Sequence, residues 1–320
     1  MQPLPSPTQS GEERPVTQPA DLLTGAVGGD RRALARLLTL IENGDRAARE
    51  LLPKIFAASR GSHLVGITGP PGAGKSTLVT ALAREYRRRG RRVGIVAVDP
   101  SSPYTGGAIM GDRIRMMEHA ADRDVFMRSM ASRGELGGIA AATWLVAAAL
   151  DAADYDPVLV ETVGAGQAEL EIARLAETTV VVEAPEMGDE IQAIKAGLLE
   201  VADVVAVNKA DRPGAERSAR QLRAMLAGAG GRFAAPPPIL LTTATTGEGV
   251  AALADAIDAD RKRARSPEQA RIRARNQLLQ AIAEGSRRRA EAHPQWDSTV
   301  KQIASHQIDP ITAAERLLEP

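Results

Sequence analysis

The segment best suited to chemistry is the glycine-rich stretch that begins at Gly69. It matches G-x-x-x-x-G-K-[ST], and it lies between a short apolar run at 64–68 and a helical pattern after residue 77. In such a P-loop the backbone N–H groups converge on a phosphate, the lysine reaches the β and γ oxygens, and the hydroxyl can ligate Mg²⁺. The sequence therefore predicts binding of a nucleoside triphosphate, through Gly69, Pro71, Gly72, Ala73, Gly74, Lys75, Ser76 and Thr77.

A second motif indicates which base is bound. Asn208, Lys209 and Asp211 form N-K-x-D at the end of an apolar run at 204–208. A carboxylate at Asp211 can accept hydrogen bonds from the ring N–H and the exocyclic amine of guanine, whereas adenine would leave it unpaired. The segment Thr243, Ala244 and Thr245, after the run at 239–243, is placed to offer a backbone N–H to the guanine carbonyl. These two segments predict GTP and GDP as the bound nucleotides.

Acidic residues follow two other apolar runs, where they could help to hold Mg²⁺. Asp99 directly follows the run at 93–98, and Glu161 lies near the end of the run at 158–162, three residues before Gly164. Asp112 lies in a glycine-rich stretch, where a solvated loop acid is the alternative interpretation. Magnesium prefers hard oxygen ligands and keeps several waters, so Ser76 and these three acids exceed what one ion needs.

The group that orients the attacking water is left open by the sequence. Gln167 is one candidate, because it follows Gly164 by three residues, and Asp99 or Glu161 acting through a metal-bound water is another. With Lys75, these three are the predicted catalytic residues. Arginines 113, 115 and 133 are candidates for a stabilising charge, with surface ion pairs as the alternative.

Short β-rich runs alternate with helical patterns between residues 63 and 260. Apolar runs of this kind indicate parallel strands buried on both faces, and the alternation predicts a doubly wound α/β domain with a mostly parallel sheet. The predicted strands are 64–68, 93–98, 125–130, 158–162, 179–184, 204–208 and 239–243.

Helical extensions are expected on both sides of this domain. We predict a disordered leader at 1–20, an N-terminal helical extension at 21–62 that breaks into two short helices at Gly44 and Pro53, and a C-terminal helical arm at 261–320. The arm starts as a basic amphipathic helix near Pro267, and a further helical pair breaks at Pro310. The basic helix could bind nucleic acid, lie on a membrane surface, or be solvated or dimer-facing; scarce aromatics and balanced charge favour the last.

Composition narrows the classes of protein further. The chain has 320 residues, 40 basic and 40 acidic side chains, 2% aromatic residues and no cysteine. The lack of cysteine excludes disulfides, thiolate metal sites and cysteine nucleophiles, and it is typical of a reducing cytoplasm. No apolar segment has the length of a membrane helix, and the first twenty residues lack the apolar core of a signal peptide.

Several stretches together resemble one family, the MeaB/ArgK type of P-loop GTPases of the SIMIBI class, which are associated with methylmalonyl-CoA mutase. They are GPPGAGKSTL at 69–78, VDPSSPYTGGAIMGDRIRM at 98–116, SRGELGG at 132–138, ETVGAGQAE at 161–169, MGDEIQAIKAG at 187–197 and NKAD at 208–211. The resemblance runs from about residue 30 to the C-terminus. It implies a homodimeric, cytoplasmic GTPase chaperone that gates delivery of adenosylcobalamin to an acyl-CoA mutase and protects the loaded mutase.

Site residues follow from the same resemblance. It implies that Ser76, Asp99, Asp112 and Glu161 form the Mg²⁺ shell, and that 162–169 is a nucleotide-dependent switch that includes Gly164. It also implies that 184–195 is a further switch contacting the mutase, with Asp189, Gln192 and Lys195. No D-x-H-x-x-G cobalamin motif is present, so the cofactor is expected to be bound by the partner.

The sequence leaves open which mutase is the partner, because at Glu186-Met187 it departs from the glycine-rich pattern of the family. Mutases that act on isobutyryl, 2-hydroxyisobutyryl or ethylmalonyl thioesters are alternatives to methylmalonyl-CoA mutase. Other functional classes are a nickel-chaperone type of metal-delivery GTPase, a kinase that acts on a periplasmic amino-acid-binding protein, and a signal-recognition-type targeting GTPase. The missing cysteines count against the first, and the eight dispersed methionines against the last.

Overall fold

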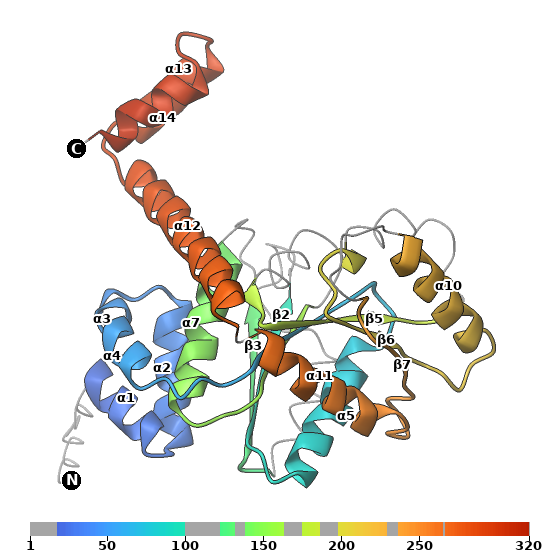
Figure 1. Ribbon diagram of the computed structural model, residues 1–320. Helices are drawn as coiled ribbons and strands as arrows, with labels where there is room; N and C mark the ends of the chain where they lie inside the picture. The colour runs from blue at the N-terminus through green and yellow to red at the C-terminus, as the bar shows by residue number, and fades with distance from the viewer. Residues whose placement is uncertain are drawn as a thin grey trace, which may run out of the picture.

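A computed structural model of the chain describes residues 18–99, 122–131, 138–162, 175–185, 198–228, 236–264 and 266–319. Its centre is a seven-stranded, all-parallel sheet in the order β3-β2-β4-β1-β5-β6-β7 (Figure 1). The strands are β1 (Leu64–Thr68), β2 (Val93–Asp99), β3 (Val125–Ala131), β4 (Val158–Thr162), β5 (Thr178–Glu183), β6 (Val204–Val207) and β7 (Ile239–Leu241). The predicted fold class, a doubly wound P-loop domain with helical extensions, is confirmed.

Helices cover both faces of the sheet, which explains why its strands are apolar on both sides. Helices α5 (Lys75–Arg88) and α11 (Val250–Ala264) pack on one face, against side chains such as Ile67 and Val182. The other face is covered by α7 (Gly138–Ala152) and, toward β6, by α10 (Ala215–Gly228). Because β1 lies between β4 and β5, the carboxyl ends of three neighbouring strands meet at the P-loop.

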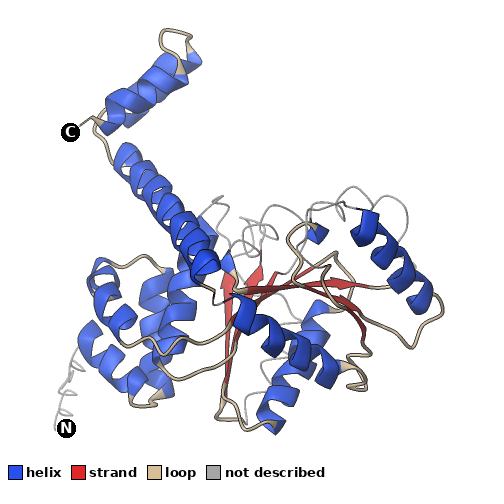
Figure 2. Cartoon of the chain, viewed as in Figure 1, coloured by secondary structure: helices blue, strands red, loops and turns tan. Residues whose placement is uncertain are grey.

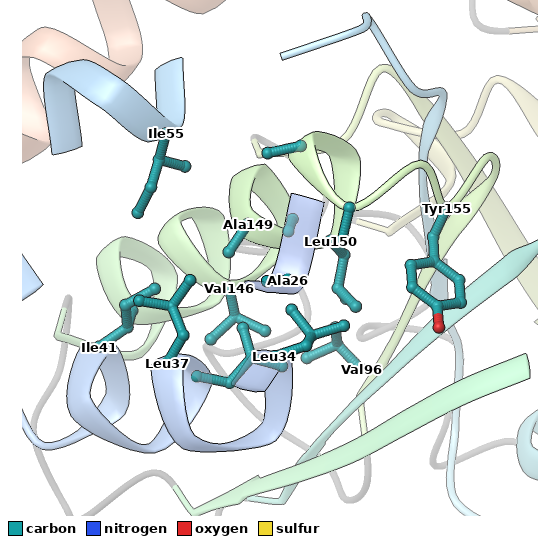
Figure 3. Close-up of a cluster of buried hydrophobic side chains, with 14 of the residues drawn as sticks. Ala26, Leu34, Leu37, Ile41, Ile55, Val96, Val146, Ala149, Leu150 and Tyr155 are labelled. Atoms are coloured by element: carbon teal, nitrogen blue, oxygen red, sulfur yellow. The ribbon is translucent and has the colours of Figure 1, made fainter. Parts of the chain in front are cut away.

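The N-terminal extension forms a cluster of helices on the outer side of α7. These are α1 (Pro19–Val27), α2 (Arg31–Glu42), α3 (Arg46–Glu50) and α4 (Leu52–Ala57). Leu34, Leu37 and Ile41 of α2 point toward Val146 and Leu150 of α7, which joins the extension to the domain core (Figure 3).

The prediction of two short N-terminal helices was wrong in one respect. The chain turns at Gly44, whose φ of +68° suits glycine, but Pro53 lies in the first turn of α4 instead of ending a helix. Proline is well tolerated in the first turn, since the N–H groups there have no intrahelical partner. Helix α1 also has proline in its first turn, at Pro19, and buries Leu22, Leu23 and Ala26.

The C-terminal arm projects away from the sheet (Figures 1 and 2). It consists of α12 (Pro267–Glu291), which begins at the predicted proline, followed by α13 (Trp296–Ala304) and α14 (Pro310–Leu318). Helix α14 packs on α12 and buries Ala313 and Leu317. Among the described helices, none combines the length and the apolar character needed to cross a membrane.

Candidate functional site

The P-loop wraps around the start of α5, and two of its glycines are required by close contacts. Gly69 has a φ of +139°, and a Cβ there would lie 2.1 Å from the Val182 carbonyl oxygen of β5. Gly74 has a φ of +89°, and a Cβ there would lie 2.5 Å from Asn208 Nδ2. Gly74 is also the N-cap of α5 and provides no side-chain cap, so the first N–H groups of the helix face the loop. That arrangement is the one that binds phosphate at a helix N-terminus.

Lys75 and Ser76 begin α5, directly under the loop. The Lys75 ammonium donates to the carbonyl oxygens of Gly69 at 2.5 Å and Pro70 at 3.2 Å, so its charge stays over the phosphate-binding loop although the residue is buried. The Ser76 hydroxyl donates to Glu161 Oε1 at 3.3 Å. Glu161 lies at the end of β4 and is fully buried. A lysine, a hydroxyl and a carboxylate therefore meet at the carboxyl edge of the sheet.

Asn208 joins the P-loop to the predicted base-binding segments. Its Nδ2 donates to the Ala73 carbonyl at 2.9 Å, and its Oδ1 accepts from the Ala244 backbone N–H at 3.1 Å and from the Thr242 hydroxyl at 3.3 Å. The Asn208 backbone N–H donates to the Glu183 carbonyl at 2.7 Å. One buried side chain thus connects the P-loop, β6 and the segment after β7.

The rest of the predicted base site lies around Asn208. Lys209 has a φ of +58° and its Nζ donates to the Gly72 carbonyl at 2.7 Å, so its stem spans the distance from β6 to the P-loop. Asp211 and Thr245 are solvent-exposed, and Thr243 is buried. The loop that follows turns back at Gly249, where a Cβ would lie 2.0 Å from the Leu241 carbonyl oxygen.

The remaining predicted residues are placed only in part. Asp99 is the last residue of β2, and the preceding residue, Val98, pairs with Thr162 of β4, so the Asp99 backbone lies at the same sheet edge as Glu161. Pro71 and Thr77 are exposed residues on either side of the loop's centre. Six other predicted residues lie outside the described residues: Asp112, Gly164, Gln167, Asp189, Gln192 and Lys195. The departure at Glu186-Met187 lies outside them too.

The described part of the site fits Mg²⁺ as far as it extends. Ser76 and Glu161 present a hydroxyl and a buried carboxylate to each other, which are the oxygen donors the ion prefers. No group of three or more acidic or histidine side chains gathers into a metal site within the described segments. The four-residue Mg²⁺ shell therefore stays a prediction.

One buried acid at this edge was not singled out from the sequence. Glu183 ends β5, is 2% exposed, and lines a cavity of about 310 Å³ with α10 residues that include Gln221 and Met225. Because β4 and β5 flank β1, Glu161 and Glu183 lie on either side of the strand that carries the P-loop. The available signal was an acid interrupting the apolar run of residues 178–184, the same signal that identified Glu161.

Comparison with known proteins identifies the relatives of this chain. A protein of Pyrococcus horikoshii named as a GTPase is 43% identical over 311 residues, which cover 94% of this chain and 98% of that protein. The mouse protein named methylmalonic aciduria type A homolog, mitochondrial, is 38% identical over 204 residues, covering 59% of this chain and 49% of that protein. A crystal structure described as a LAO/AO transport system kinase covers 94% of this chain and 96% of its own, with a TM-score of 0.69 and 26% identity.

The family itself is given by a match over most of the chain. The family described as methylmalonyl-CoA mutase-associated GTPase MeaB matches residues 34–294, which span the P-loop, the base-binding segments and the start of the arm. The Pyrococcus horikoshii relative is named as a GTPase, in agreement with the geometry of the P-loop and of Asn208. The chain therefore belongs to the MeaB family of P-loop GTPases.

Proposed function

We propose that this protein is a GTP-driven chaperone of an adenosylcobalamin-dependent acyl-CoA mutase, acting in the cytoplasm. It uses GTP binding and hydrolysis to gate loading of the cofactor and to protect or reactivate the mutase. Methylmalonyl-CoA mutase is the first client to test, because the matching family is named for association with that enzyme. Mutases for isobutyryl, 2-hydroxyisobutyryl or ethylmalonyl thioesters are the alternatives.

The observation that carries this proposal is the family match over residues 34–294. The contacts of Asn208, which join the P-loop to the predicted base-binding segment after β7, support it. The mouse relative adds support, since its name refers to a disorder of methylmalonate. The described segments contain no cluster of metal-ligating side chains, and the whole chain has no cysteine, so delivery of a metal ion gains no support. We assign adenosylcobalamin to the mutase because the chain contains no D-x-H-x-x-G cobalamin motif.

Hydrolysis is proposed to depend on positioning and charge more than on covalent chemistry. The Lys75 ammonium, held over the loop by the Gly69 and Pro70 carbonyls, is placed to neutralise the β and γ oxygens. Ser76, Glu161 and Asp99 would hold Mg²⁺, which supplies further charge neutralisation when bound. Within the described residues no glutamine lies at the loop, so we expect slow turnover until a partner completes the site.

A homodimer is part of the same proposal. Four large apolar side chains of α12 are 46–61% exposed: Ile272, Leu278, Leu279 and Ile282. Ile311 on α14 is 75% exposed. An exposed apolar stripe along a projecting helix is typical of an interface. If the partner is a second copy of the arm, the apolar side chains of both chains are covered by one interface.

The proposal is tested by measuring GTP hydrolysis with and without a cobalamin-dependent acyl-CoA mutase from the same source. Phosphate release, adenosylcobalamin transfer and the mutase's turnover of its substrate would be measured in parallel. ATP is the nucleotide control. We expect the mutase to accelerate GTP hydrolysis, and GTP hydrolysis to govern transfer of adenosylcobalamin. Light scattering on the purified chain tests the homodimer separately.

A kinase is the second candidate, because the structural relative is described as a transport system kinase. A kinase would move the γ-phosphate from a nucleotide to a protein acceptor, so the same reactions would be run with γ-³²P-labelled GTP and ATP and a periplasmic amino-acid-binding protein. Label on the acceptor would favour the kinase, and label only in inorganic phosphate would favour the GTPase chaperone.

A further inference from the structure

A second cavity lies at the base of the C-terminal arm, away from the nucleotide site. Its volume is about 170 Å³, and it is bordered by α4, by α7 and by the first half of α12, which begins beside α7 (Figure 1). Leu64 and Val158, the first residues of β1 and β4, also line it. The P-loop follows the other end of β1, so the cavity lies at the opposite edge of the sheet from the nucleotide site.

One part of the cavity lining is apolar. Leu64, Ala148 and Leu175 contribute aliphatic surface. Phe56 of α4 and Trp144 of α7 form an aromatic pair, with ring centroids 5.3 Å apart, and Phe56 is 57% exposed, so this pair reaches the molecular surface. An apolar cavity of roughly 150 Å³ is large enough to bind benzene, so the volume here suits a ligand with about six carbon atoms.

Two polar side chains of α12, one helical turn apart, also line the cavity: Arg273 and Gln277. The Arg273 side chain is 16% exposed, and its one ion pair within the described residues, to Glu177 Oε1, has a length of 3.9 Å. That distance is longer than a hydrogen bond. In the described part of the chain, neither Arg273 nor Gln277 forms a side-chain hydrogen bond. A guanidinium carries five N–H donors, and burying them without acceptors is unfavourable.

The buried acid of the cavity is already supplied with donors. Asp151 of α7 is 8% exposed, and its carboxylate accepts hydrogen bonds from the hydroxyls of Ser59 and Ser62. It also accepts from the backbone N–H groups of residues 60–62, at 2.9 to 3.3 Å. A carboxylate has about four lone-pair sites, so these five donors leave it little capacity for more. What the cavity still lacks is an acceptor for the two α12 side chains.

We propose that this cavity binds a small organic monocarboxylate, held by Arg273 and Gln277 at one end and by the aromatic pair at the other. A carboxylate matches the planar guanidinium through two parallel hydrogen bonds. A cationic ligand fits less well, because it would meet the Arg273 charge and would have to displace the donors bound to Asp151. Since Arg273 and Gln277 belong to the arm and the aromatic pair to α4 and α7, the bound ligand contacts the arm and the body of the protein at once.

Tryptophan fluorescence tests this proposal, because Trp144 lines the cavity and the chain has one other tryptophan, Trp296. The full chain with Trp296→Phe is titrated with hexanoate, and the emission of Trp144 is followed. Hexanamide and hexylamine, a neutral amide and a cation with the same carbon chain, are the ligand controls. We expect a saturable change with hexanoate, and binding at least about tenfold weaker for both controls, because neither can accept two hydrogen bonds as an anion.

Variants in the same background test the residues. Arg273→Gln should weaken hexanoate binding by at least about tenfold, whereas Arg275→Gln, an exposed arginine of the same helix that does not line the cavity, should bind like the parent. Ala148→Leu fills the cavity and should abolish binding. Unchanged GDP affinity in each variant, measured by calorimetry, shows that the fold is intact, because the nucleotide site lies at the other sheet edge.

Three results would overturn the proposal. They are the lack of a saturable change at millimolar hexanoate, equal or tighter binding of hexylamine, and parent-like hexanoate binding by Arg273→Gln. If Arg273→Gln loses its GDP affinity, the comparison of the three ligands and the Ala148→Leu variant decide the outcome in its place.

Discussion

The Asn208 side-chain amide donates a 2.9 Å hydrogen bond to the Ala73 carbonyl, so the base-binding motif and the phosphate-binding loop share one buried contact. The oxygen of the same amide accepts from the Ala244 backbone N–H at 3.1 Å. The P-loop and the segment after β7 are far apart in the sequence, and both are thereby bound to one side chain.

Asn208→Ala should disconnect the two halves of the nucleotide site. The change leaves the Ala73 carbonyl and the Ala244 N–H without their partner, and a buried unsatisfied group costs about 1–3 kcal/mol. We expect GDP affinity to fall by about 10- to 100-fold, measured by calorimetry. Thr242→Val, which removes only a 3.3 Å bond to the same amide, is the control and should have a much smaller effect. Equal losses in the two variants would contradict the bridging role of Asn208.

Asp211→Asn should change which base is preferred. Xanthine carries a carbonyl where guanine carries the exocyclic amine, and an asparagine amide can donate to that carbonyl where an aspartate can only accept. We expect GTP binding to weaken by at least about tenfold while xanthosine triphosphate gains affinity, measured by competition against a labelled nucleotide. Unchanged preference for GTP would show that Asp211 does not read the base.

Two P-loop glycines should respond differently to alanine. Gly69→Ala places a Cβ 2.1 Å from the Val182 carbonyl, so we expect loss of nucleotide binding and a lower midpoint of urea unfolding. Gly72→Ala is the matched control: its φ is +78°, but a Cβ there has no neighbour within 4 Å, so only about 1 kcal/mol of backbone strain is expected. A Gly69 variant that binds as well as the Gly72 variant would contradict the close packing of the loop on β5.

Asp203 should make the folding stability depend on pH. Burial raises the pKa of Asp203 to about 6, and the charge of nearby Asp260 also raises it. The hydrogen bond from the Thr179 backbone N–H lowers the pKa in part. The native state therefore binds a proton that the unfolded chain has released, and this contribution to stability is lost as pH rises from about 4 to 6.

Asp203→Asn removes that contribution. The free energy of unfolding of the parent protein, relative to that of the variant, should therefore be lower at pH 8 than at pH 5. Urea unfolding at both pH values measures it. Asp255→Asn is the control, because that side chain is 71% exposed and paired only at the surface. A difference that is flat with pH would contradict the raised pKa.

Much of the sheet could be predicted because its strands are short apolar runs. Strands β1 and β4 have the predicted bounds, whereas β7 ends at Leu241, two residues early, because the chain turns after Thr242 and Thr243 pairs with Glu248 in that turn. The start of helix α1 was missed, because the helix begins at Pro19, inside the leader predicted at 1–20, and buries Leu22, Leu23 and Ala26 against helices that include the neighbouring α2. A helix of nine residues is too short to give a clear periodic pattern of apolar residues.

The site was predictable in part for a related reason. Lys75 and Asn208 come after the carboxyl ends of β1 and β6, Glu161 lies near the carboxyl end of β4, and a parallel sheet brings these strand ends to one edge. The bond from Asn208 to Ala73 could not be read from spacing, because it depends on how β6 sits beside the P-loop in three dimensions. Glu183 was overlooked because no glycine follows it by three residues, as Gly164 follows Glu161.

Glu161→Gln should separate binding from hydrolysis. The variant keeps the shape of the side chain beside the Ser76 hydroxyl but removes the charge, so we expect GTP hydrolysis to fall by at least about tenfold and its dependence on magnesium concentration to weaken. Glu177→Gln, a change at the opposite edge of the sheet, is the control and should hydrolyse GTP at the parent rate. Equal rates in the two variants would exclude Glu161 from the Mg²⁺ shell.

The central claim is that hydrolysis of GTP by this chain responds to a cobalamin-dependent mutase. The most direct measurement is the steady-state rate of GTP hydrolysis by the purified protein, alone and with such a mutase, with ATP and the Asp211→Asn variant as controls. The account predicts a rate that rises on adding the mutase, with ATP inert and the variant unresponsive at the same GTP concentration. A GTP hydrolysis rate that the mutase leaves unchanged would contradict it.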